Sequence, residues 1–123
     1  MDVNFDNKTP IYIQIMYIIK RDMAKGKLRG GDKLPSVREL SSKLKVNPNT
    51  VQRTYQELER SGFTFTERGK GTFVTEDEDI VSDLKKDLAN KVLEDFIKGM
   101  KNLGFDADDI IDIVSERIKK EGK

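Results

Sequence analysis

The first stretch with a regular apolar pattern lies between Thr9 and Gly26 and predicts an amphipathic helix. Its apolar residues recur three and four positions apart and therefore share one helical face. They are Tyr12, Ile15, Ile19 and Met23. Thr9 followed by Pro10 is typical of a helix start, because threonine caps a free backbone N–H and proline loses no hydrogen bond at the first helical position. Gly26 is expected to end the helix.

Two further helices have equally clear starts. Ser36, followed three positions later by a glutamate, forms the pattern of a capping box and predicts a short helix over residues 37–44. Asn47 followed by Pro48 repeats the pattern of cap and proline, so a third helix is expected over residues 48–61. The apolar period then changes from about 3.6 to 2. Alternating phenylalanines and threonines, the glycine turn "RGKG" and the segment "TFV" predict a β-hairpin over residues 63–75.

Two more helices are expected after the hairpin. Thr75 with Glu78 suggests a capping box at the start of the first, Gly104 is expected to end it, and Asp106 to cap the second. Both carry apolar stripes that a lone helix does not leave in water. The stripes comprise Leu84, Leu88, Val92, Phe96, Met100 and Leu103 in the first helix, and Ile110, Ile111, Ile113, Val114 and Ile118 in the second.

We expect these stripes to form a homodimer interface, since a symmetric dimer is the commonest way to bury an unmet apolar face. The alternative is that the tail folds back onto the chain's own first helix. Ile13, Met16 and Tyr17 offer spare apolar area there.

The composition narrows the possible chemistry. Cysteine and histidine are both absent, which removes disulfides, thiolate metal sites and the commonest metal ligand and general base. No apolar run is long enough to cross a bilayer and no export signal is expected, so we expect a cytoplasmic protein without membrane contact. Asp106, Asp108, Asp109 and Asp112 could suggest a divalent metal site. Capping and the helix dipole explain them better, so we expect no metal, no cofactor and no enzyme.

Charge divides the chain into two parts. Residues 1–75 hold 14 Lys/Arg against 8 Asp/Glu, a net of +6, whereas residues 76–123 hold 9 against 14, a net of −5. The basic part is a candidate for binding a polyanion. We expect a DNA-binding domain over residues 1–76 and a dimerisation tail over residues 77–123.

Three short helices followed by a hairpin is the order of a winged helix-turn-helix, in which the third helix enters the major groove of DNA. The fold expected is therefore mainly helical, with one small hairpin. On a helical wheel Val51, Tyr55 and Leu58 share the face that packs inward. The opposite face carries Asn49, Gln52, Arg53 and Gln56. Amides and arginine can form paired hydrogen bonds with base edges in the major groove. A polar helix face is more often merely solvated, and a winged helix can instead dock on a protein partner.

Five motifs resemble one known family closely: "TPIYIQI", "LPSVREL", "VNPNTV", "ELERSG" and "RGKGTFV". They look like the N-terminal DNA-binding domain of the GntR family of bacterial transcription regulators, and the likeness spans residues 9–75. The 48 residues that follow are enough for two helices, as in the YtrA-like subfamily. The resemblance implies a homodimer that binds a palindromic operator and uses its short tail to dimerise. We expect a repressor.

The resemblance also implies which residues meet DNA. Arg38 matches a position that grips DNA, and Gly71 matches the glycine of the wing tip beside Lys70. Gln52 stands where many members have arginine, and Pro48 replaces an arginine found in some. The predicted DNA-binding residues are Arg38, Asn47, Asn49, Thr50, Gln52, Arg53, Gln56, Lys70 and Gly71. A small-molecule effector is possible. The two-helix tail is too small to enclose it, so we expect any such ligand at the dimer interface.

Overall fold

A computed structural model describes residues 3–122 and contains two compact units. The first unit ends at Lys86 and the second begins at Asp87, so the boundary lies within the fourth helix. The first turns of that helix thus belong to the first unit. The functional division at residues 76 and 77 stays a prediction.

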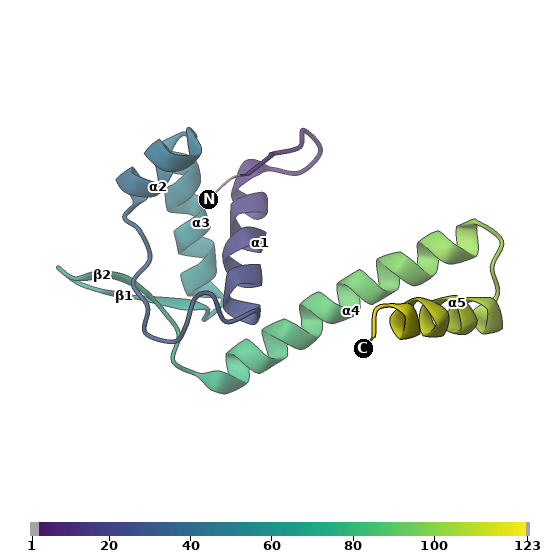
Figure 1. The fold of residues 1–123 in the computed structure, drawn as a ribbon. Helices are drawn as coiled ribbons and strands as arrows, with labels where there is room; N and C mark the ends of the chain where they lie inside the picture. The colour runs from purple at the N-terminus through teal and green to yellow at the C-terminus, as the bar shows by residue number, and fades with distance from the viewer. Residues whose placement is uncertain (1–2, 123) are drawn as a thin grey trace. The chain divides into compact units, whose positions relative to one another are not determined.

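The first unit begins with three helices, α1 (Ile11–Ala24), α2 (Val37–Leu44) and α3 (Pro48–Arg60), as the apolar pattern predicts (Figure 1). α3 packs against both α1 and α2. The largest fully buried side chains come from all three helices and from the strand that follows them. They include Ile15, Ile19, Met23, Leu40, Val51, Leu58 and Val74.

The predicted start of α1 is wrong by one residue. α1 begins at Ile11, and Pro10 occupies the cap position, where no side chain caps the helix. Proline fits there because its backbone is extended. The Gln14 side chain instead holds the preceding segment: its amide donates to the Thr9 carbonyl (2.7 Å) and accepts from the Asp6 N–H (3.0 Å).

The starts of α2 and α3 are confirmed. Ser36 and Glu39 form a reciprocal capping box on α2. The Asn47 side chain accepts a hydrogen bond from the Asn49 N–H at 2.8 Å, with proline at the first position of α3. Lys45 links the two helices in the left-handed conformation, with φ of 58°. This reversal lets α3 start after a connection of only three residues, 45–47.

The wing is an antiparallel hairpin of β1 (Thr64–Glu67) and β2 (Gly71–Val74). A third extended segment pairs with β2: the Gly31 N–H donates to the Val74 carbonyl (2.9 Å) and the Leu34 N–H to the Thr72 carbonyl (2.8 Å). Lys33 bridges to Phe73 in the same segment. The short extended piece between α1 and α2 therefore acts as an additional edge of the wing.

The two faces of β1 differ in burial. Thr64 is buried and its hydroxyl makes no hydrogen bond. Phe65 points the other way and stacks on Phe73, with ring centroids 5.7 Å apart. A threonine thus occupies a position on the core side of the hairpin where a purely apolar side chain would fit.

We expect Thr64→Val to raise the free energy of unfolding by about 1 kcal/mol, because it removes a buried hydroxyl that lacks a partner and keeps the side-chain shape. Urea denaturation of the full chain measures this. Thr66→Val is the matched control, since Thr66 lies on the same strand but is exposed. A loss of stability in Thr64→Val would mean that the hydroxyl has a partner in solution.

The tail comprises α4 (Glu78–Asn102) and α5 (Ala107–Lys120), as predicted. The capping box expected at Thr75 and Glu78 is wrong. Asp77 caps α4 instead, accepting hydrogen bonds from the Asp79 N–H (2.9 Å) and the Ile80 N–H (3.3 Å). Asp77 wins because it directly precedes the first helical residue and is itself a strong cap. Asp106 caps α5 as predicted.

The apolar residues of the tail differ in exposure. Leu84 and Ile110 are only 4% and 8% exposed, so the single chain already buries these two residues of the predicted stripes. Val92 and Phe96 are 62% and 39% exposed. The other exposed apolar residues of the tail are Leu93, Leu103, Phe105, Ile111, Ile113 and Ile118. Leu88, Met100 and Val114 are half-buried.

Candidate nucleic-acid interface

Helix α3 has one buried face and one exposed polar face. Its buried residues are Val51, Thr54, Tyr55 and Leu58. Asn49, Gln52 and Gln56 are exposed. The predicted division of this helix into a packing face and a polar face is confirmed, and Thr50 lies half-buried at the margin between them.

Two hydroxyl groups fasten α3 to the rest of the unit. The Tyr55 hydroxyl donates to the Pro35 carbonyl at 2.6 Å. Burial raises the pKa of this hydroxyl far above its usual range, with the charge of Glu39 adding to the effect, so it remains a donor. The Thr54 hydroxyl lies 3.0 Å from the Thr50 carbonyl and 3.3 Å from the Tyr12 carbonyl of α1. The polar face is therefore presented from a fixed helix.

Arg53 differs from the other residues of the polar face. Its guanidinium lies over the Tyr12 ring, 3.9 Å from the centroid, and donates to the Tyr12 hydroxyl at 3.2 Å. This contact holds the Arg53 side chain against Tyr12, and the guanidinium keeps further N–H groups that can bind a phosphate. Asn49, Gln52 and Gln56 remain the side chains that can extend toward bases.

Arg38 lies exposed in the first turn of α2. Beside it, the hydrogen bonds from the Ser36 backbone and side chain lower the pKa of the Glu39 carboxyl. Glu39 therefore stays ionised near neutral pH, and its carboxylate accepts the hydrogen bond from the Ser36 N–H. Arg38 belongs to the same turn and supplies the positive charge on this surface.

The wing turn depends on two glycines with positive φ. Gly69 has φ of 80° and Gly71 has φ of 126°, conformations that other residues rarely adopt. The Lys70 N–H closes the turn by donating to the Glu67 carbonyl at 2.9 Å. The Lys70 ammonium lies 3.8 Å from the Glu67 carboxylate, and both side chains are exposed. An ion pair of this kind is weak, so Lys70 can exchange it for a phosphate.

Two residues beside the predicted site were missed. Tyr12 positions Arg53 from α1, 41 residues away in the chain. Lys33 lies beside Gly71, where a Cβ added to the glycine would come within 2.7 Å of the lysine Cε. The first contact leaves no local signal in the sequence. The second could have been suspected from a lysine in a short extended segment before the hairpin.

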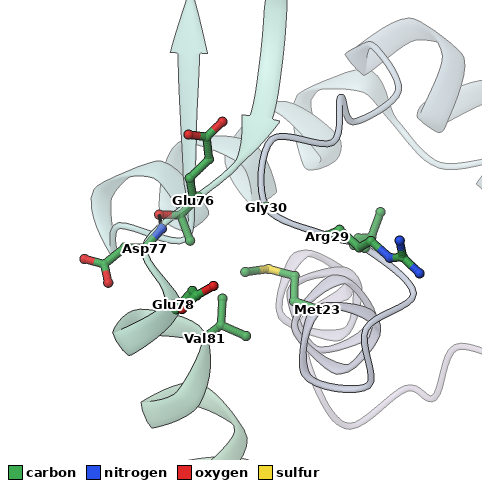
Figure 2. Close-up of a pocket in the computed structure, with 9 residues that line it drawn as sticks. Met23, Arg29, Gly30, Glu76, Asp77, Glu78 and Val81 are labelled. Carbon is green, nitrogen blue, oxygen red and sulfur yellow. Dashed lines mark hydrogen bonds between the residues drawn. The ribbon is translucent and has the colours of Figure 1, made fainter.

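A hollow of about 390 Å³ lies in the first unit, where the wing leads into α4 (Figure 2). Met23, Leu28 and Val81 line it with apolar atoms, and its charged lining residues are Arg29, Glu76, Asp77 and Glu78. The excess of negative charge disfavours a nucleic-acid phosphate. Its volume is within the range of small-ligand pockets, although no pocket was predicted in this unit.

Within residues 3–122 no group of three or more carboxylates is arranged to hold a metal ion. Asp106 and Asp109 bind backbone N–H groups at the start of α5. No helix in the described range is long and apolar enough to cross a membrane.

Comparison with known proteins extends these observations. Residues 11–74 match the family described as "Bacterial regulatory proteins, gntR family". The "Uncharacterized HTH-type transcriptional regulator YhcF" of Bacillus subtilis (strain 168) is 48% identical over 112 residues, 91% of this chain and 93% of that protein. The "HTH-type transcriptional repressor YtrA" of the same strain is 51% identical over 70 residues, 57% of this chain and 54% of that protein. A solved structure, "GntR family transcriptional regulator from Listeria monocytogenes", is 44% identical with a TM-score of 0.83, and the match covers 91% of this chain and 98% of that one.

The family match covers the three helices and the wing, and the match to YhcF continues into the tail at nearly full length. The expected likeness to small YtrA-like regulators is thereby confirmed. The chain belongs to the gntR family of bacterial regulatory proteins and is a DNA-binding transcriptional regulator rather than an enzyme.

Proposed function

We propose that this regulator represses transcription by binding a palindromic operator as a homodimer, with α3 in the major groove and the wing at the minor groove. The observation that carries the proposal is the exposed face of α3, where Asn49, Gln52 and Gln56 stand on a helix whose other face is buried. Amide side chains of this kind pair with the donor and acceptor of adenine in the major groove.

Two arguments support the dimer, one from the target and one from the tail. Two recognition helices must be about 34 Å apart, or a multiple of one DNA turn, to occupy both half-sites of a palindrome. The exposed apolar residues of α4 and α5 supply a surface that a second copy can cover. Repression is the simplest action of such a dimer, since it blocks polymerase, and the relative YtrA is named a repressor. Because the target is the chromosome, we place the protein in the cytoplasm.

Selection of binding sites from random duplex DNA tests the reading face directly. We expect Asn49→Ala and Gln52→Ala each to relax preference at particular base pairs and to weaken the selected site by about 1–3 kcal/mol. Neither change should lower the thermal midpoint, because both side chains are exposed. Selection profiles identical to the parent's would show that this face of α3 does not read bases.

Arg38→Ala is the comparison for the same experiment. It should weaken binding to all sequences by a similar factor and flatten the dependence on salt, since a phosphate contact carries no base preference. A parent protein that retains no duplex DNA at low salt would favour a winged helix that docks on a protein partner instead.

A further inference from the structure

Lys33 is fixed to the wing by its backbone. It forms a β-bridge with Phe73 of β2. Its neighbours Asp32 and Leu34 are both hydrogen-bonded to the same strand. The Val74 N–H donates to the Asp32 carbonyl at 2.8 Å, and the Leu34 N–H donates to the Thr72 carbonyl at 2.8 Å. The Cα of Lys33 is therefore held in register with the wing, although Lys33 precedes β1 by about thirty residues in the chain.

The side chain of Lys33 runs across the end of β2. A Cβ added to Gly71 would lie 2.7 Å from the Lys33 Cε, 3.6 Å from Nζ and 3.7 Å from Cδ. The lysine stem therefore occupies the space that a side chain at position 71 would fill. Its φ of 126° requires Gly71 to be glycine, and a side chain added there would displace the flexible end of Lys33.

The ammonium of Lys33 is exposed, and no carboxylate within residues 3–122 lies close enough to form an ion pair with it. Its charge nevertheless reaches the first turn of α2. The hydrogen bonds of Ser36 chiefly lower the pKa of the Glu39 carboxyl, and the charge of Lys33 adds to that effect. Lys33 thus adds a positive charge beside Gly71 of the wing and near the first turn of α2.

We propose that Lys33 binds a DNA phosphate from the base of the wing, and that the absence of a side chain at Gly71 keeps its ammonium in place. The proposal rests on the DNA-binding mode proposed above, in which the wing approaches the duplex. A lysine ammonium suits this task because a point charge grips phosphate without reading the base.

Lys33→Met tests the charge, since methionine keeps an apolar stem of similar length. The probe is a random-sequence DNA duplex titrated with full-length protein over a range of sodium chloride concentrations. The slope of log K against log salt should become shallower by about 0.9 for each bound chain, and the affinity near 0.15 M salt should fall about fivefold per chain. Lys33→Arg, which keeps the charge, should have the same slope as the parent. Lys119→Met, which removes a charge from α5, should also have the parent's slope.

Gly71→Ala tests the role of the stem. The added Cβ should displace the Lys33 side chain and weaken DNA binding, whereas the same change in a Lys33→Met background should weaken it much less. Gly69→Ala is the matched control: its φ is 80°, but nothing lies within 4 Å of the added Cβ. It measures the effect of backbone strain in the wing without moving Lys33.

The outcomes separate two kinds of failure. A parent with a salt-dependent affinity and a Lys33→Met variant with the same slope would overturn the role of Lys33 and leave the proposed function standing. A parent that shows no salt-dependent binding to the duplex would overturn the proposed function itself. Equal losses from Gly71→Ala with and without Lys33 would show that the glycine serves only the backbone.

Discussion

Replacing both Val92 and Phe96 with aspartate should convert the proposed homodimer into a monomer and lower its affinity for the proposed operator by about 100-fold or more. The two side chains are 62% and 39% exposed and lie four residues apart, so they share one face of α4. Each aspartate would place an unpaired charge within an apolar interface, which costs several kcal/mol. Loss of the second recognition helix then removes the gain from binding two half-sites at once.

Light scattering measures the mass of the parent and of this double variant at tens of micromolar, and titration with the selected operator measures affinity. The matched control is Asn90→Asp with Lys98→Asp, which adds negative charge at two exposed positions of the same helix without removing apolar surface. It should remain a dimer. A parent that is monomeric, or a Val92→Asp/Phe96→Asp variant that still dimerises, would contradict this interface.

The sequence predicted the elements whose signals are local. A capping box involves residues three positions apart, so Ser36 could be identified as the start of α2 without knowing the fold. Asn47 before Pro48, and Asp106 as the cap of α5, are equally local signals. Where two good caps lie two residues apart, the pattern alone does not choose between them: Thr75 and Asp77 both fit, and the start of α4 at Glu78 places Asp77 at the cap.

Contacts between distant segments could not be predicted. The stacking of Arg53 on Tyr12 joins α3 to α1, and no periodicity in either helix indicates it. The pairing of Lys33 with β2 involves a segment too short to show alternation. The same limit explains Leu84 and Ile110, because an apolar stripe shows which residues share a helical face but not which of them the chain itself covers.

The two faces of α3 could be predicted from the sequence, whereas the exposed apolar residues of the tail could not be separated from its buried ones, for a physical reason. A recognition helix needs a buried face and a polar face, and a single helical wheel separates Tyr55 from Gln52. The sequence of a dimer surface carries no comparable signal. Residues buried by the chain itself and residues buried by a partner chain are equally apolar. Only the burial of each side chain in the folded chain distinguishes Leu84 from Val92.

The packing face of α3 leads to the second large effect. Leu58 is 0% exposed, and its truncation to alanine should lower the free energy of unfolding by about 2–5 kcal/mol through lost burial and the cavity left behind. Since domains of this kind are stable by only about 5–15 kcal/mol, the variant should be close to unfolding at physiological temperature.

The expected signature of Leu58→Ala is loss of stability without change of specificity. Urea denaturation at fixed protein concentration measures the first, and site selection at low temperature measures the second. Gln56→Ala is the control from the opposite, exposed face of the same helix. It should change the preferred bases and leave the free energy of unfolding unchanged. If Leu58→Ala altered the preferred bases while Gln56→Ala lowered stability, the two faces of α3 would have to be exchanged. The division between a face that folds the domain and a face that reads DNA would then be wrong.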